Sequence, residues 1–186
     1  HNVVYWNQKA VEADLKYYTD KGAFNLYTGY RQHDYHFVIY GALFLGQLEP
    51  ALAANQGLWD TTPEKLLRIE TPPMADYFES YMAMEPHVLI RFGRWDEAIS
   101  LKPPSDPDLY RTLTATTHYA RAIGFAATGR VAEAEADLAR RQIEAFNAAE
   151  AAGEGVAVVD GKIVENLHIV TANRILAQVE AIAEMA

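Results

Sequence analysis

The chain of 186 residues contains no cysteine. Disulfide bonds, thiolate nucleophiles and cysteine-based zinc sites are therefore excluded within it. It also lacks an uninterrupted apolar run of the roughly 18 residues that a membrane span requires. Positive charge is scarce as well, because 16 Lys and Arg residues stand against 25 Asp and Glu residues, for a formal charge of −9. We therefore expect neither a nucleic-acid partner nor a membrane partner, since both need clustered cations.

The familiar catalytic motifs are missing too. The sequence has no glycine-rich phosphate loop, no HExxH zinc motif and no GxSxG nucleophile elbow. We therefore expect no cofactor, and the sequence favours a role other than catalysis. It does not specify a cellular compartment.

Helical periodicity dominates what is present. Half of the residues are hydrophobic, which is enough for a substantial core. Apolar residues recur at helical spacing, and the expected helices are 2–18, 32–45, 50–59, 63–69, 73–84, 94–100, 110–128, 131–151 and 165–186. The proline-rich stretch Leu101–Leu109 is expected to be a linker. VAVVDGKIV, around Asp160 and Gly161, is expected to form a small hairpin or an irregular loop.

Three short segments resemble one another. They are GQLEPA from Gly46, GRWDEA from Gly93 and GRVAEA from Gly129. Each has a glycine that can end one helix in a left-handed turn, an apolar residue for the angle between helices, and an alanine that permits close helix contact. Such internal similarity is typical of repeated helical hairpins.

On these segments the chain resembles the tetratricopeptide repeat family. The family pattern, of 34 residues per repeat, matches Gly46, Leu48, Ala51 and Pro63 best. The spacing departs from the pattern, because Gly93 follows Gly46 by 47 residues and Gly129 follows Gly93 by 36. The resemblance implies an all-α, right-handed solenoid of about seven to nine helices. It would form one domain over 1–186, with units at about 32–65, 79–105 and 115–150.

The chain also resembles a bacterial group of tetratricopeptide-like proteins of unknown function. That group carries a segment of the type Tyr-Arg-x-His-x-x-His-Phe, which matches Tyr30–Phe37, and a later Phe-Gly-Arg-Trp-Asp-Glu, which matches Phe92–Glu97. The resemblance brings no reaction with it.

In the family, certain positions of the first helix of each repeat line a concave groove. Counting from the glycines places seven candidate ligand residues in or near this groove: Arg31, His33, His36, Tyr40, His87, Arg91 and Arg121. Arginines there would bind carboxylates in a bidentate manner. The leading hypothesis is thus a scaffold that binds a peptide or protein, such as an acidic or C-terminal peptide.

Other interpretations of these residues stay open. His33 and His36 share a helix face and could bind a divalent metal, with His87, Glu79 or Glu85 as a third ligand. This would make the chain a metal-dependent or small-molecule-binding protein. Alternatively, the histidines satisfy buried carbonyls and hold the helices in register. Asp76 and Glu79 are a candidate acid/base pair. The tyrosines of this region either line the groove or, as helical spacing favours, belong to the core.

The two ends of the sequence resemble unpaired halves of repeats. Residues 2–18 resemble a second helix without its first, and residues 165–186 resemble a first helix without its second. We therefore expect a fragment of a longer repeat protein, self-association through these end helices, or a structural segment of a larger assembly.

Overall fold

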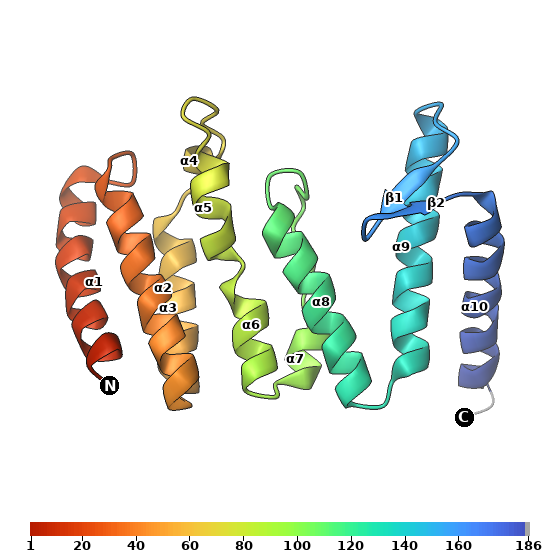
Figure 1. Cartoon of the computed structure of the whole chain (residues 1–186), viewed down its shortest axis with the longest axis horizontal. Coiled ribbons are helices and arrows are strands. Elements are labelled where there is room, and N and C mark those ends of the chain that lie inside the picture. Colours follow the sequence, from red (N-terminus) through yellow and green to blue (C-terminus); the bar gives the residue numbers. More distant parts are fainter. Residues whose placement is uncertain (185–186) are drawn as a thin grey trace. The chain divides into compact units, whose positions relative to one another are not determined.

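The computed structural model describes residues 1–184, with side chains through 181, and it is mostly helical (Figure 1). The all-α prediction is confirmed at this level. The chain divides into two compact units, His1–Gly124 and a second that begins at Phe125. The first unit contains α1 (Asn2–Lys21), α2 (Tyr27–Leu45), α3 (Leu48–Thr61), α4 (Glu64–Leu67), α5 (Met74–Met82), α6 (Met84–Arg91), α7 (Trp95–Ser100) and most of α8 (Arg111–Ala127).

The second unit holds α9 (Val131–Ala151), the hairpin strands β1 (Ala157–Val159) and β2 (Lys162–Val164), and α10 (Asn166–Glu184). The strands are antiparallel and pair Ala157 with Val164. Asp160 and Gly161 both have positive φ, at 51° and 73°, as a two-residue hairpin turn requires. The expected hairpin is thus confirmed. Its inner face is buried, since Ala157 and Val164 pack with Phe146 of α9, and this contact supports a ribbon too short to be stable alone.

The three predicted helix-ending glycines have the left-handed conformation. Their φ values are 68° at Gly46, 64° at Gly93 and 72° at Gly129. In each case the following residue donates its backbone N–H to the carbonyl five residues earlier, at 2.9, 2.9 and 2.8 Å respectively. This is the Schellman geometry, in which a residue without a side chain closes the helix end. The prediction that these glycines end helices in a left-handed turn is therefore confirmed.

The alanines that follow these glycines differ in their packing. Ala51 and Ala98 are completely buried, whereas Ala134 is only half-buried. The apolar residue of the third segment, Val131, is 55% exposed. The third segment therefore keeps the turn but packs less closely than the first two.

Three of the expected helices differ from those observed. The helix expected from residue 32 begins five residues earlier, at Tyr27. The helix expected over 63–69 is the single turn α4, and beyond it the N–H of Ile69 bonds to the carbonyl of Leu66 at 3.3 Å. The helix expected through Met84 is interrupted at Ala83 and restarts as α6. Pro86 lies in the first turn of α6, where its missing N–H needs no intrahelical partner.

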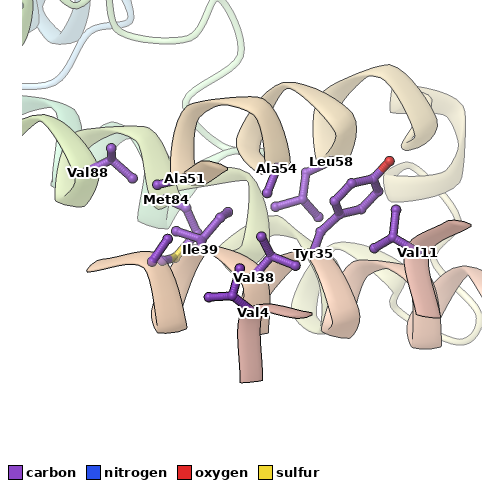
Figure 2. Close-up of a cluster of buried hydrophobic side chains, with 11 residues drawn as sticks. Val4, Val11, Tyr35, Val38, Ile39, Ala51, Ala54, Leu58, Met84 and Val88 are labelled. Atoms are coloured by element: carbon purple, nitrogen blue, oxygen red, sulfur yellow. The ribbon is translucent and has the colours of Figure 1, made fainter. Parts of the chain in front are cut away.

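The main core of the first unit lies where α1, α2, α3 and α6 meet (Figure 2). Ile39 from α2 and Leu58 from α3 are fully buried at its centre. The other buried members are Val4, Val11, Tyr35, Val38, Ala42, Ala51, Ala54, Met84 and Val88. Small alanines on α2 and α3 let the two helices approach closely. The opposite side of α2 does not take part in this core.

None of the helices in the part of the chain that the structure describes is both long enough and apolar enough to cross a bilayer.

Candidate functional site

One side of α2 carries a row of rings, which we call the aromatic face. It consists of Tyr30, His33, Phe37, Tyr40 and Phe44. Residues spaced by three and four lie above one another on a helix, and the ring centroids of His33 and Phe37 are 4.5 Å apart while those of Tyr40 and Phe44 are 5.0 Å apart. Tyr30, Tyr40 and Phe44 are 60%, 49% and 73% exposed. Rings thus lie along about four turns of one helix, and Tyr30, Tyr40 and Phe44 among them face solvent.

His36 lies beside the aromatic face but is half-buried. Its ring meets Tyr81 of α5 edge-on at 5.4 Å and stacks on Tyr40 at 6.0 Å. Burial, together with the nearby charge of His33, lowers the pKa of His36 below its ordinary value of 6.5. His36 is therefore neutral at pH 7, and it acts as an aromatic spacer between α2 and α5.

The predicted histidine metal site is not assembled. His87 is exposed on α6, whereas His36 is enclosed by rings. Within the described residues, no group of three or more His, Cys, Asp or Glu side chains is placed to hold a metal ion. His33, His36 and His87 therefore do not converge on one point.

Arg31, expected in the groove, is completely buried instead. Its Nη2 donates to the carbonyl of Thr61 at 2.9 Å, and its Cζ lies 4.6 Å from the centre of the Tyr18 ring. Burial lowers the pKa of the guanidinium. Nε and Nη1 have no hydrogen-bond partner in the described structure. Arg31 joins α1, α2 and the end of α3, so it cannot meet a ligand in an open groove.

The other two predicted arginines have different surroundings. Arg91 is exposed at the end of α6, with its Cζ 5.9 Å from the ring of Phe92. Arg121 is half-buried, and its Nη1 donates to the carbonyl of Leu101 at 3.1 Å. Of the three arginines predicted to bind a carboxylate, Arg91 is the one whose side chain is exposed.

Asp76 and Glu79, the candidate acid/base pair, line one cavity beside the start of α8 but have different surroundings. Asp76 is exposed, while Glu79 is 6% exposed and accepts two backbone hydrogen bonds at the start of α8. Glu79 thus has a structural partner that the sequence did not indicate. The acid/base role of the pair stays a prediction, with Glu79 engaged by the backbone of α8.

A pair of carboxyl groups joins α1 and α2, and sequence reasoning missed it. Asp14 and Asp34 are within hydrogen-bonding reach of each other. Burial, the hydrogen bond to Asp14 and the charge of Asp14 together raise the pKa of Asp34 to about 6, against a smaller lowering by His33. Two carboxyl groups this close share one proton. Because they come from different helices, no pattern along the chain could have paired them.

Comparisons with known proteins give one short match. No family model matches the sequence, and no solved structure matches it. A segment of 50 residues is 72% identical to curated proteins named (3S)-malyl-CoA thioesterase from three strains of Cereibacter sphaeroides. The segment is 27% of this chain and 18% of each of those proteins. The match therefore spans less than a fifth of these relatives.

Proposed function

We propose that the chain is a partner-binding module, and that the aromatic face of α2 holds a segment of a peptide or protein. The observation that carries the proposal is the exposure of Tyr30, Tyr40 and Phe44 on one side of one helix. Exposed rings in a contiguous row are unusual on a surface that faces only water. Aromatic side chains are also those that contribute most to binding at protein interfaces.

For the finer fold we propose a tetratricopeptide-like array of helical hairpins. Three observations support it: the left-handed glycines between α2 and α3, between α6 and α7, and between α8 and α9; their shared hydrogen-bond pattern; and the complete burial of Ala51 and Ala98. In such an array the first helices of the hairpins line the binding side. α2 would be one of these first helices.

The chemistry of the face indicates the kind of partner. It presents rings, and Arg31, one of the three arginines predicted to bind an acidic peptide, is buried, whereas Arg91 is exposed at the end of α6. The chain as a whole carries a charge of −9. We therefore propose a partner segment with apolar anchor residues flanked by basic residues, because the anchors match the rings and the basic flanks match the field of the protein.

The test is selection of peptides from a displayed random library, followed by titration of the selected peptides against variants. The double variant Tyr40→Ala, Phe44→Ala should weaken binding by at least about tenfold, as expected for the loss of two aromatic anchors. Trp6→Ala is the matched control, since Trp6 is an exposed ring on α1 (64%) outside the face. Selected peptides that bind the double variant as tightly as the wild type would overturn the proposal.

A second candidate role is that of a segment in a larger assembly. On α10, Leu167 and Val170 are 70% and 63% exposed, and Ile163 of β2 is 63% exposed. The test measures self-association by sedimentation velocity for the wild type and for the double variant Leu167→Glu, Val170→Glu. Self-association lost in the variant supports this role, while a monomer at all concentrations counts against self-association through α10.

The activity in the name of the matched proteins is not extended to this chain. The shared segment is 18% of those thioesterases, and function resides in a site rather than in a short stretch of similarity.

A further inference from the structure

A cavity in the first unit is independent of the aromatic face. It has a volume of about 290 Å³ and lies where the end of α3, α4, the start of α6, the segment 101–110 and α8 come together. Its lining includes Trp59, Glu64, Glu85, Lys102, Ser105 and Tyr110. The volume is near the lower end of the range for small-ligand sites. It therefore suits a single small group rather than a large cofactor.

One wall of the cavity is the proline-rich segment Leu101–Leu109, whose composition predicts a linker. Arg68 binds Asp106 of this segment at 2.7 Å and Glu64 of α4 at 2.8 Å. Asp106 also accepts the backbone N–H of Leu109 at 3.1 Å. Two side-chain contacts and the prolines thus hold the wall in place before any ligand arrives. A site whose lining is already ordered loses less conformational entropy when a ligand binds, and its affinity is higher for that reason.

Two aromatic rings form a second part of the lining. The centroids of Trp59 and Tyr110 are 5.9 Å apart, with the ring planes at 31°. Tyr110 is 6% exposed, so its ring is held firmly. The faces of such rings are electron-rich and attract cations, and tryptophan does so most strongly.

Glu85 is a carboxylate of the cavity lining that has no counter-ion among the described side chains. The residue is half-buried, and among the described side chains it has neither a hydrogen bond nor an ion pair. Burial, with a contribution from the charge of Glu97, raises the pKa of Glu85 above its ordinary value. Glu64 differs, because Arg68 already pairs with it. A cation placed beside Glu85 would offset the desolvation of this carboxylate.

We propose that this cavity binds an organic cation, a primary ammonium or guanidinium group, with Glu85 as its counter-ion and Trp59 and Tyr110 as its aromatic wall. An anionic ligand would meet two carboxylates, and a neutral ligand would leave Glu85 unpaired. The group can belong to a free amine or to a lysine or arginine side chain of a peptide. Lys102, exposed in the same lining, opposes binding through its like charge.

The experiment titrates the protein with three probes by calorimetry and by the fluorescence of Trp59 in a Trp6→Phe, Trp95→Phe background. The probes are agmatine, the blocked peptide acetyl-Gly-Arg-Gly-amide, and the same peptide with citrulline, which has the shape of arginine without its charge. We expect one saturable site for a guanidinium probe and at least about tenfold weaker binding of citrulline. Binding of the blocked arginine peptide identifies a side chain as the source, and binding of agmatine alone identifies a free amine.

Variants test the assignment of residues. Glu85→Gln should weaken binding of the guanidinium probe by about tenfold or more, whereas Lys102→Met should strengthen it. Glu49→Gln, an exposed carboxylate on α3 outside the cavity lining, is the matched control and should bind as the wild type does. If neither guanidinium probe binds at millimolar concentration, or if citrulline binds as well as arginine, the proposal is overturned. The calorimetric comparison of the probes uses the wild-type chain, so it decides the matter even if Glu85→Gln fails to fold.

Discussion

Glu79 on α5 accepts a hydrogen bond from the backbone amide of Leu113, 34 residues further along the chain, at 2.8 Å. Its second oxygen accepts the amide of Thr112 at 3.1 Å. The first amides of a helix have no partner within the helix, so this carboxylate from a distant helix does for α8 what a local capping residue usually does. The negative charge also lies at the positive end of the helix dipole. Glu79 thereby connects α5 to the start of α8 through two hydrogen bonds.

Replacing Glu79 by alanine should therefore destabilise the first unit. Two partly buried amides lose a charged acceptor. Hydrogen bonds to charged groups contribute about 1.5–3 kcal/mol each at most, and water recovers part of the loss. We expect the free energy of unfolding in urea to fall by about 2 kcal/mol. Hydrogen exchange at the amides of Thr112 and Leu113 should speed up in the same variant.

The control for this prediction is Asp76→Ala on the same helix. Asp76 is exposed and was the other half of the acid/base pair that the sequence suggested. Its replacement should change the unfolding free energy by less than about 0.5 kcal/mol. Equal effects of the two variants would show that Glu79 does not cap α8.

The pair of Asp14 and Asp34 predicts a dependence of stability on pH. The folded state raises the pKa of Asp34 from 3.8 to about 6. Between these values the folded protein holds a proton that the unfolded chain has released, so this contribution to stability is present at low pH and is lost as the pH rises through about 6. Asp34→Asn keeps a donor toward Asp14 without the second charge. At pH 7 it should be more stable than the wild type by about 1 kcal/mol or less, because partial exposure screens the pair.

The measurement is the urea midpoint of the wild type and Asp34→Asn at several pH values between 4 and 7. The advantage of the variant should shrink toward pH 4, where Asp34 of the wild type is protonated and no longer repels the charge of Asp14. Asp76→Asn makes the same chemical change at an exposed site and should follow the wild type. An advantage that does not vary with pH would contradict the shared proton.

We predict that a side chain at Gly57 on α3 destabilises the protein, because an added Cβ would clash with the ring of Tyr35. A Cβ at this position would overlap the Tyr35 ring, which is only 7% exposed and is held among core residues (Figure 2). Alanine would improve helix propensity by up to about 1 kcal/mol, but overpacking costs about 1–3 kcal/mol. We expect Gly57→Ala to lower the unfolding free energy by about 1–2 kcal/mol. Tyr35→Leu replaces the ring by a smaller side chain, so it should lower the unfolding free energy less in the Gly57→Ala background than in the wild type. If the losses in the two single variants simply add in the double variant, the clash is contradicted.

Gly46 should resist substitution for the opposite reason. No atom lies within 4 Å of an added Cβ, but the backbone is left-handed, with φ 68° and ψ 33°. Gly46→Ala should cost about 1–2 kcal/mol in unfolding free energy, and Gly46→Asn less, because asparagine adopts this conformation more readily. Gly155→Ala, which has open space and no positive φ, is the control for both glycines and should be nearly neutral. Equal tolerance of alanine at Gly46 and Gly155 would refute the conformational argument.

The candidate site was predictable only in part. His33 and Tyr40 were expected on an open side of their helix and are exposed there, since their spacing along one helix is a local property. Arg31 was expected beside them and is buried, because its position on α2 turns it toward α1 and the end of α3. An arginine gives no sign along the chain that a tyrosine ring and a distant carbonyl will enclose it.

What the sequence by itself determined is local. Gly46, Gly93 and Gly129 end helices in a left-handed turn because a side chain there is strained in any context, and the Asp160-Gly161 pair forms a hairpin turn for the same reason. The tertiary structure decided the pairing of side chains from distant segments: Glu79 with the start of α8, Asp14 with Asp34, and Glu85 with the rings of one cavity. These contacts depend on how whole helices pack, and packing energy is a property of neighbours in space rather than in sequence.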